Sequence, residues 1–370
     1  MVQIVYKVVR VYVLEMKLNK ITQIVHNSNF FVYSFTFLAL SMFMVLGNQT
    51  LWAQNANFSI GQFQTPQGTH PHDVAVDPAD NGPVWFTAQG TGDLGKLDPK
   101  TGNKTFIQLG NASGPHMNGS APHGVKLGPD GALWITDEFQ RAIVRVDPKT
   151  EEIKKFPIPE FVRYTLLNTA TFDKSGVLWF TDRSGYYGKL DPSEGKVHYW
   201  AAPRGSGPYG ITTTPDGSVY FNSWTGNYTA KIDLKTGNLT ILEPPTKDSM
   251  PRRIWSDSKG QLWITEWAAG KLAKYDPATN KWQEWKLPGI QPQPYAVYVD
   301  EHDKVWVSDF GETNGKQSML RFDPVSQKFD VIPLPSDHSD VRMIHGRAGQ
   351  IWGAESGIDR IMVIRTGNVT

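Results

Sequence analysis

Cysteine is absent from this sequence of 370 residues. Its absence excludes disulfide bonds, thiolate metal sites and a cysteine nucleophile. An excess of charge of one sign is also missing, since 37 basic residues stand against 36 acidic ones. The chain therefore lacks the electrostatic footprint of a nucleic-acid-binding protein. No phosphate loop, G-x-S-x-G elbow or H-E-x-x-H motif is present.

A repeated aromatic position is the strongest signal that the sequence does contain. Seven times, at intervals of 41 to 49 residues, a tryptophan or tyrosine leads a stretch of the type W-F-T-D or W-I-T-E. A fixed period near this length, with short strands and no helical pattern, is typical of a β-propeller. We therefore predict an all-β, seven-bladed propeller over residues 57–370, with four antiparallel strands in each blade. The seven positions are Trp85, Trp134, Trp179, Tyr220, Trp263, Trp306 and Trp352.

One repeat predicts the strands of a blade, and the last repeat predicts how the ring closes. Alternating residues and Gly or Pro turns place strands at 122–127, 133–137, 143–146 and 153–157. The seventh unit ends without an outer strand. Residues 58–63 resemble the outer strands of other blades. We expect them to complete the last blade, because an open ring would leave unpaired strand edges.

The first 56 residues differ from the repeats. Residues 30–47 form an uncharged run after Lys17 and Lys20, which indicates a signal peptide or a membrane anchor. Translation could start at Met1 or Met16, and Ala53 offers a cleavage point. N-x-S/T sequons support export. We expect an extracellular or cell-surface, glycosylated monomer that meets the membrane only through residues 30–47 if the leader is retained. The sequons begin at Asn48, Asn57, Asn103, Asn111, Asn118, Asn227, Asn238 and Asn368.

Two positions per blade are expected to face the central channel at one end. The first set opens the innermost strands and comprises His72, His123, Asn168, Tyr209, Arg252, Tyr295 and Arg342. The second set ends the second strands and comprises Ala88, Asp137, Asp182, Ser223, Glu266, Asp309 and Glu355. Polar residues are costly in a buried strand without a purpose. Together the two sets predict a mouth that binds a small molecule, a peptide or a glycan. Each carboxylate alone could instead cap a turn or pair with a basic residue.

The sharpest cluster lies in the first two blades. His72 and His123 occupy equivalent positions, Asp137 shares a blade with His123, and His116 lies in an insertion that could fold over the mouth. Imidazoles and a carboxylate can hold a divalent ion or transfer protons near neutral pH. We expect His72, His123 and Asp137 to bind a divalent metal, with either histidine as the base. The residues expected to contact the substrate are His116, Asn168, Asp182, Tyr209, Arg252, Glu266, Tyr295, Asp309, Arg342 and Glu355.

Several motifs resemble the virginiamycin B lyase (streptogramin B lyase) family over residues 57–370. They are P-H-G-V at 122–125, D-G-A-L-W-I-T-D at 130–137 and above all L-W-I-T-E-W-A-A-G-K-L at 262–272. The resemblance implies a seven-bladed propeller that opens a cyclic depsipeptide by elimination at its ester. It also implies a magnesium ion that acidifies the proton alpha to the carbonyl, and a histidine base. The regucalcin–gluconolactonase group is a more distant match.

The family's site residues are only partly present. In chain order, its first P-H histidine falls on Arg252, and the next blade has Gln293 and Tyr295 for the glutamate and second histidine. One blade further, the equivalent positions hold Tyr295, Asp340, Arg342 and Glu355. A rotated alignment gives His72, His123 and Asp137, with Ala121 at the glutamate position. Arginine cannot replace a histidine base, because it stays protonated.

Three functions remain open from the sequence. The first is a metal-assisted lyase or hydrolase acting on a cyclic or carbonyl-bearing substrate. The second is a non-catalytic propeller that binds a glycan, peptide or protein at the same mouth. The third is a lactonase of the regucalcin type.

Overall fold

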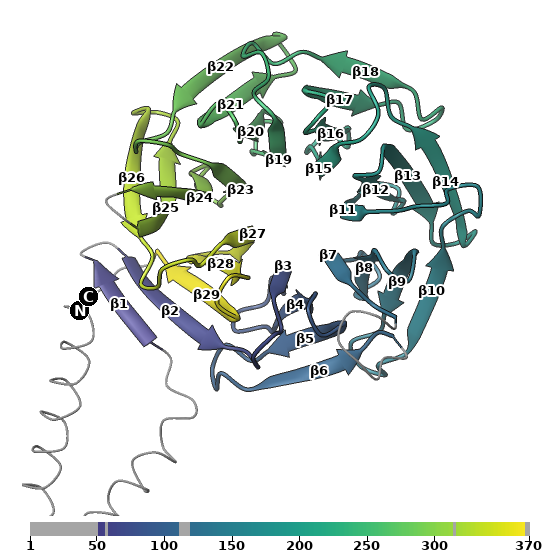
Figure 1. The fold of residues 1–370 in the computed structure, drawn as a ribbon, viewed down its shortest axis with the longest axis horizontal. Helices are drawn as coiled ribbons and strands as arrows, with labels where there is room; N and C mark the ends of the chain where they lie inside the picture. Colours follow the sequence, from purple (N-terminus) through teal and green to yellow (C-terminus); the bar gives the residue numbers. More distant parts are fainter. Residues whose placement is uncertain (1–50, 56–57, 111–118, 314–315, 367–370) are drawn as a thin grey trace, which may run out of the picture. The chain divides into compact units, whose positions relative to one another are not determined.

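The computed structural model describes residues 51–55, 58–110, 119–313 and 316–366, and this part contains strands and turns only. Seven antiparallel sheets stand around a central channel, so the predicted seven-bladed propeller is confirmed (Figure 1). Across the described ranges, no helix has the length and apolar character needed to cross a membrane. The expected leader at 30–47 and the insertion histidine His116 lie outside the described residues.

Six blades are built from four consecutive strands each, with the first strand beside the channel. In the second blade, the strands cover the predicted ranges, except that the third begins at Ala142. The first three blades contain β3 (Pro71–Val76), β4 (Val84–Ala88), β5 (Asp93–Leu97), β6 (Lys104–Gln108); β7 (Pro122–Leu127), β8 (Leu133–Asp137), β9 (Ala142–Val146), β10 (Ile153–Pro157); β11 (Leu167–Phe172), β12 (Leu178–Asp182), β13 (Tyr186–Asp191), β14 (Lys196–Ala201). The next three contain β15 (Pro208–Thr213), β16 (Val219–Ser223), β17 (Tyr228–Ile232), β18 (Leu239–Leu242); β19 (Pro251–Ser256), β20 (Leu262–Glu266), β21 (Lys271–Asp276), β22 (Lys281–Lys286); β23 (Pro294–Val299), β24 (Val305–Thr313), β25 (Lys316–Asp323), β26 (Lys328–Pro333).

The seventh blade joins the two ends of the propeller. Strands β27 (Val341–Arg347), β28 (Gln350–Glu355) and β29 (Arg360–Arg365) are followed in the sheet by β2 (Phe58–Gln64), which pairs antiparallel with β29. The predicted closure by the N-terminal strand is confirmed. The sequence did not indicate β1 (Leu51–Asn55), which adds a fifth strand outside β2. The expected cleavage point after Ala53 falls within β1.

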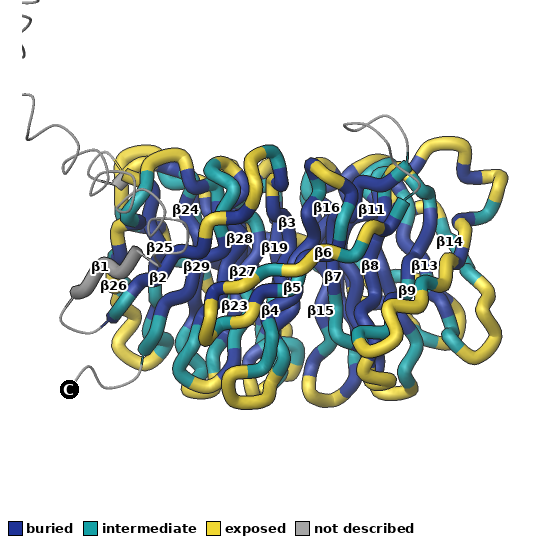
Figure 2. The backbone as a smooth tube through the Cα atoms, turned by 90° about the horizontal axis from the view of Figure 1, so that it is seen from below, coloured by how far each residue is buried: buried dark blue, intermediate teal, exposed yellow. Residues whose placement is uncertain are grey.

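The recurring aromatic residues form the core between the blades. The indoles of Trp134, Trp179, Trp263 and Trp306 are almost fully buried, and each Nε1 donates to an aspartate of the preceding turn at 2.8–3.0 Å. This bond satisfies the polar atom that burial would otherwise leave unpaired. Burial follows the strands, while the turns at both faces are exposed (Figure 2). The core therefore holds the inner strands rigidly around the channel.

A β-bulge interrupts each of the seven innermost strands one residue after its start. In β3, the register shifts between Pro71 and Val74, so two residues, His72 and Asp73, lie where one would be expected. The same shift occurs in β7, β11, β15, β19, β23 and β27. A bulge redirects side chains and is common beside active sites. Here it allows two consecutive residues of one strand to face the channel.

The threonine of the W-x-T motif fixes this bulge. In the first blade, the Thr87 hydroxyl accepts the Asp73 N–H at 2.9 Å and donates to the carbonyl of His123 in the next blade at 2.8 Å. Thr136 and Thr265 make the same pair of contacts in their blades. The repeated motif therefore sets both the bulge and the spacing of neighbouring blades.

Candidate functional site

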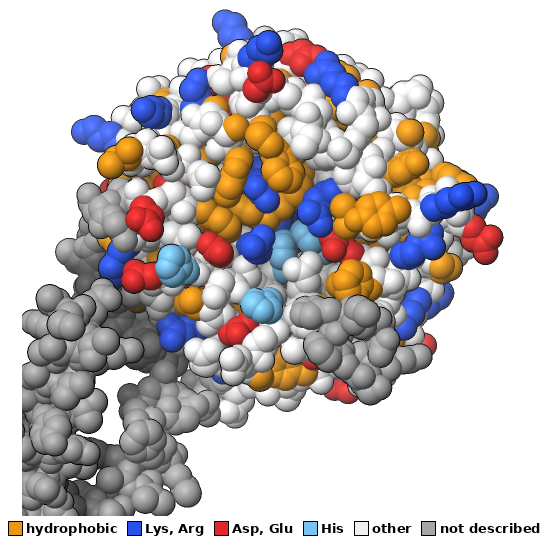
Figure 3. All heavy atoms as spheres, viewed as in Figure 1, with side chains coloured by type: hydrophobic (Ala, Val, Ile, Leu, Met, Phe, Trp, Pro, Cys, Tyr) orange, Lys and Arg blue, Asp and Glu red, His pale blue; other side chains and the backbone are white. Residues whose placement is uncertain are grey.

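A cavity of about 570 Å³ opens at the end of the channel where the innermost strands begin. We call this opening the mouth. Figure 3 shows basic and histidine side chains gathered there, next to a crescent of hydrophobic side chains. Six of the seven residues in the first predicted set line it, and Asn168 is buried against His123. The lining residues are His70, His72, Gln89, His123, Arg183, Tyr209, Arg252, Tyr295, Asp340, Arg342, Ser356 and Gly357.

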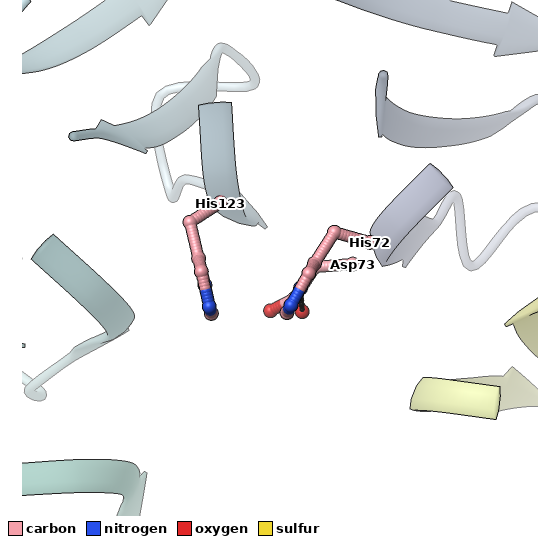
Figure 4. Close-up of side chains that lie close together, drawn as sticks. All are labelled: His72, Asp73 and His123. Atoms are coloured by element: carbon pink, nitrogen blue, oxygen red, sulfur yellow. Dashed lines mark hydrogen bonds and ion pairs between the residues drawn. The ribbon is translucent and has the colours of Figure 1, made fainter. Parts of the chain in front are cut away.

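His72 and His123 lie side by side and point into the channel from β3 and β7 (Figure 4). Their ring centroids are 3.8 Å apart. His72 Nδ1 lies 2.9 Å from Asp73 Oδ1, and a carboxylate only accepts, so we place the proton on Nδ1. No described residue forms a hydrogen bond with His72 Nε2. The free lone pair of this imidazole is therefore at Nε2.

A chain of buried hydrogen bonds connects the two histidines below the mouth. Arg253 donates to Asp73 Oδ1 at 2.9 Å and to the Thr169 hydroxyl at 2.7 Å. Thr169 then donates to Asn168 Oδ1 at 2.7 Å, which leaves the Asn168 amide to donate to His123 Nε2 at 3.1 Å. His123 consequently carries its proton on Nδ1. Both imidazoles are therefore the Nδ1–H tautomer, but Asn168 occupies Nε2 of His123, so only His72 offers a free Nε2.

Burial and positive charge keep both imidazoles neutral. Desolvation, followed by the guanidinium groups of Arg253, Arg342 and Arg183, lowers the pKa of His72 well below its usual value. Burial and then the neighbouring His72 lower the pKa of His123 in the same way. At neutral pH both imidazoles are therefore uncharged, and each has one ring nitrogen with a lone pair.

Arg252 occupies an aromatic box at the mouth. Its guanidinium carbon lies 3.9 Å from the ring centroid of Tyr295, and 4.5 Å from those of both Trp224 and Trp267. Its Nη2 donates to the Tyr209 hydroxyl at 3.3 Å. The side chain is only 9% exposed, and among the described residues no carboxylate pairs with it. The box holds the charge through cation–π contacts without neutralising it.

The two tyrosines of the first set share a short hydrogen bond between their hydroxyls. Burial acts to raise the pKa of Tyr209, but Arg252 and Arg253 outweigh it and bring the pKa to about 8. Burial raises the pKa of Tyr295, and the negative charge that Tyr209 can carry raises it further. The pair can release one proton near neutral pH, and Tyr209 is the hydroxyl that gives it up.

The second predicted set is kept out of the cavity, since none of its members is among the lining residues. Asp137 accepts from the Ala121 N–H at 3.0 Å and from Ser120 and Gln140, so both its oxygens serve its own blade. Asp182 and Asp309 cap turns through the N–H groups of residues 166 and 293. Glu355 holds the closing strand through Gln62. The remaining members are buried at equivalent strand ends: Ala88, Ser223 and Glu266.

The structure brings Asp73, not Asp137, to the two histidines. The candidate metal ligand atoms of His72, Asp73 and His123 all lie within 4.8 Å of one another. However, Asp73 is already paired with Arg253, and three more arginines line the cavity above. Mg²⁺ prefers several oxygen ligands and no nearby cation. These residues therefore do not suit the magnesium ion that the family resemblance implies.

Sequence reasoning missed the residues that come directly after the first set. Asp73, Thr169 and Arg253 each follow a predicted channel residue, and strict alternation would turn them away from the channel. The bulge brings them in. The available signal was chemical, because a carboxylate, a hydroxyl and a guanidinium are unusual at positions that ought to be apolar. Among the inner strands, Arg253, Trp255 and Met343 help to line a second, much smaller space of about 10 Å³.

The fold and its repeated motifs identify a class of protein, and comparison with known proteins identifies the family. The model of the virginiamycin B lyase family matches residues 50–319, so the chain belongs to this family. A virginiamycin B lyase of Nocardia farcinica is 27% identical over 182 residues, which is 49% of this chain and 62% of that protein. A gluconolactonase of Zymomonas mobilis subsp. mobilis is 30% identical over 127 residues, which is 30% of this chain and 35% of that protein.

The solved structures show the same architecture. A crystal structure of virginiamycin B lyase from Staphylococcus aureus matches with a TM-score of 0.74 and 20% identity, covering 83% of this chain and 99% of that one. Such a likeness establishes the fold and not the reaction. The matched regions span about a third and about three fifths of the two curated relatives. The chemistry must therefore be argued from the residues at the mouth.

Proposed function

We propose that this protein is a carbon–oxygen lyase in which His72 is the general base. One observation carries the proposal: Asp73 holds the Nδ1 proton of His72, which leaves a free Nε2 lone pair at a cavity large enough for a substrate. An oriented, neutral imidazole is suited to remove a proton alpha to a carbonyl group. The family membership supports elimination as the type of reaction.

The reaction would proceed through the chain's own side chains. His72 Nε2 takes the proton from the carbon alpha to the carbonyl, the electron pair forms a carbon–carbon double bond, and the bond from the beta carbon to oxygen breaks. Negative charge develops on the carbonyl oxygen and on the leaving oxygen. Arg252 and Arg342 line the cavity and would stabilise the first charge. Tyr209, with its lowered pKa, would protonate the leaving oxygen.

The arginines take over the role that a metal ion has in the family resemblance. A guanidinium polarises a carbonyl oxygen by charge and by two parallel N–H donors. We therefore expect calorimetric titration with Mg²⁺ to give no stoichiometric binding and a chelator to leave activity unchanged. Stoichiometric binding that His72→Gln abolishes would restore the metal-assisted lyase.

The test compares His72→Gln with His70→Gln. Both histidines line the cavity, but His70 is exposed, and among the described residues its ring forms a hydrogen bond only with the backbone oxygen of Ser356, so it is the matched control. Suitable substrates are a streptogramin B depsipeptide and an oligogalacturonide, since both carry an oxygen beta to a carbonyl. Elimination gives an alkene without gain of water. We expect His72→Gln to lower the rate by about 10²- to 10⁴-fold and His70→Gln to leave it nearly unchanged.

Two outcomes would contradict the proposal. One is failure of the lyase assay itself, seen as no alkene from either substrate with the wild-type protein or as an unchanged rate in His72→Gln. The other is a product that has gained one water molecule, which would favour the lactonase alternative suggested by the gluconolactonase relative. Binding without turnover would favour the non-catalytic propeller.

A further inference from the structure

We propose that the mouth recognises the carboxylate group of a sugar acid, with Arg252 and Arg342 as its counter-charges. Recognition of the anion stands on the geometry of these residues alone. The part the carboxylate plays in elimination rests on the proposed function.

Arg252 is a buried cation without a counter-ion. Removal of a guanidinium from water is costly unless a negative group compensates it. Its aromatic neighbours supply cation–π contacts, and its Nε is a buried donor with no partner among the described residues. The side chain lines the cavity, so an anion in the mouth can reach it. A bound carboxylate would balance the positive charge of Arg252 and accept hydrogen bonds from its unpaired N–H groups.

Arg342 approaches the same cavity from the seventh blade. Its Nε donates to the Ser356 hydroxyl at 2.6 Å, and no described carboxylate lies within ion-pair distance of it. Its guanidinium carbon is 5.9 Å from the Tyr295 ring, the same ring that Arg252 stacks against. The two cations therefore share one aromatic neighbour, and both line the cavity that an anion would enter.

The charges around the cavity favour an anion. Three arginines and one carboxylate, Asp340, are among the lining residues. Arg183 is neutralised by Glu138 at 2.7 Å, and Asp340 accepts from the Gln317 amide at 2.8 Å. Asp340 keeps its negative charge, so the lining is net positive, and among the described residues neither Arg252 nor Arg342 pairs with a carboxylate. A neutral or cationic ligand would leave this positive field in place.

The aromatic wall beside the arginines indicates a ring in the ligand. Trp224, Trp267 and Phe310 are only partly buried, and Phe310 stacks on Tyr295 with centroids 4.7 Å apart. Trp224 and Trp267 flank Arg252, and Figure 3 shows hydrophobic side chains beside the basic group at the mouth. A sugar acid combines a carboxylate with a ring that can lie on such a wall.

The same carboxylate would serve the reaction. In a uronic acid unit the proton next to the carboxylate is the one to be removed, and the neighbouring ring carbon bears the glycosidic oxygen. His72 takes that proton, the ring gains a double bond, and the glycosidic oxygen leaves with a proton from Tyr209. No oxidant or further reactant is needed. Pairing of the carboxylate with two guanidinium groups lowers its negative charge and so acidifies the adjacent C–H.

The experiment measures binding of D-galacturonate and of D-galactose to the wild-type protein by calorimetry. The two sugars share the ring and differ in the carboxylate. We expect D-galacturonate to bind at least about tenfold more tightly. Arg252→Met and Arg342→Met should each weaken it by about 10- to 100-fold, which is typical for loss of a hydrogen bond to a charged group.

Arg321→Met is the matched control. Arg321 also stacks over aromatic rings, Phe58 and Trp306, but it pairs with Asp330 on strand β26 and does not line the cavity. It should bind D-galacturonate like the wild type. If Arg252→Met does not fold, Arg342→Met, whose side chain is only partly buried, decides the question.

Equal affinity for the two sugars, or no binding of either, overturns the inference. An equal loss in Arg321→Met and Arg342→Met also overturns it, because it would indicate attraction by net charge alone. Selective binding of the acid without formation of an alkene from an oligogalacturonide supports this site while contradicting the lyase. Elimination from the depsipeptide without selective binding of D-galacturonate supports the lyase while contradicting the carboxylate site.

Discussion

The ion pair between Asp73 and Arg253 links two blades across the channel, 180 positions apart in the sequence. The two side chains are 1% and 3% exposed, and the distance between Oδ1 and Nη2 is 2.9 Å. Asp73→Asn would leave the guanidinium buried without a counter-charge, and Arg253→Met would do the same to the carboxylate. Each change is expected to cost about 3–5 kcal/mol of unfolding free energy. The double variant leaves neither charge alone, so it should cost about 2 kcal/mol or more less than the sum of the single variants.

Urea unfolding followed by tryptophan fluorescence measures these differences, and an unchanged urea dependence shows that the unfolding reaction is the same in all variants. The control is the surface pair of Arg321 and Asp330, with side chains 29% and 54% exposed. Solvent screening should reduce its coupling to below about 1 kcal/mol. Additive losses at Asp73 and Arg253 would refute the reasoning, since they would mean that neither charge depends on the other.

Three further predictions concern the scaffold and its modification. Burial raises the pKa of Glu355 from 4.5 to about 7, so the folded state favours the protonated form and loses stability as pH rises between these values. Glu355→Gln should match the wild type near pH 4 and be up to about 3 kcal/mol more stable at pH 8, and a gain that does not vary with pH would contradict this. Removal of residues 1–64 eliminates the closing strand and should lower the melting temperature far more than removal of residues 1–50; equal values would count against closure by β2. Expression in a glycosylating secretory system should modify the exposed Asn238 and spare Asn227, whose side-chain oxygen accepts from the Met250 N–H; peptide mapping by mass spectrometry would show the reverse if this reasoning fails.

Much of the architecture could be predicted because the strands and turns of each blade are specified by residues close together in the sequence. Turn residues and period-two alternation located strands such as 122–127 and 133–137 to the residue. The missing outer strand of the last repeat pointed to residues 58–63, and β2 fills that place. These features depend on short stretches of chain, and short stretches are what a sequence pattern reports reliably.

The candidate site could be predicted only in part. The first set of channel residues was identified because it begins the innermost strands, and six of its seven members line the cavity. Asp73 and Arg253 were missed because a bulge breaks the alternation on which the prediction relied. The second set was misplaced because a carboxylate at a strand end can face a ligand or cap a turn. Asp137 caps its turn, and that choice depends on loop geometry rather than on residue type.

The small space between the inner strands has a consequence for how a ligand reaches and leaves the protein. A ring of blades is often pictured as a tunnel, but here Arg253, Trp255 and Met343 line a space of only about 10 Å³ among the inner strands. A space of about 10 to 15 Å³ is the least that can hold one water molecule. A substrate does not fit into that space, so we expect it to bind at the mouth and not in this narrow part of the channel. We therefore expect product release and the binding of the next substrate to take place at the mouth.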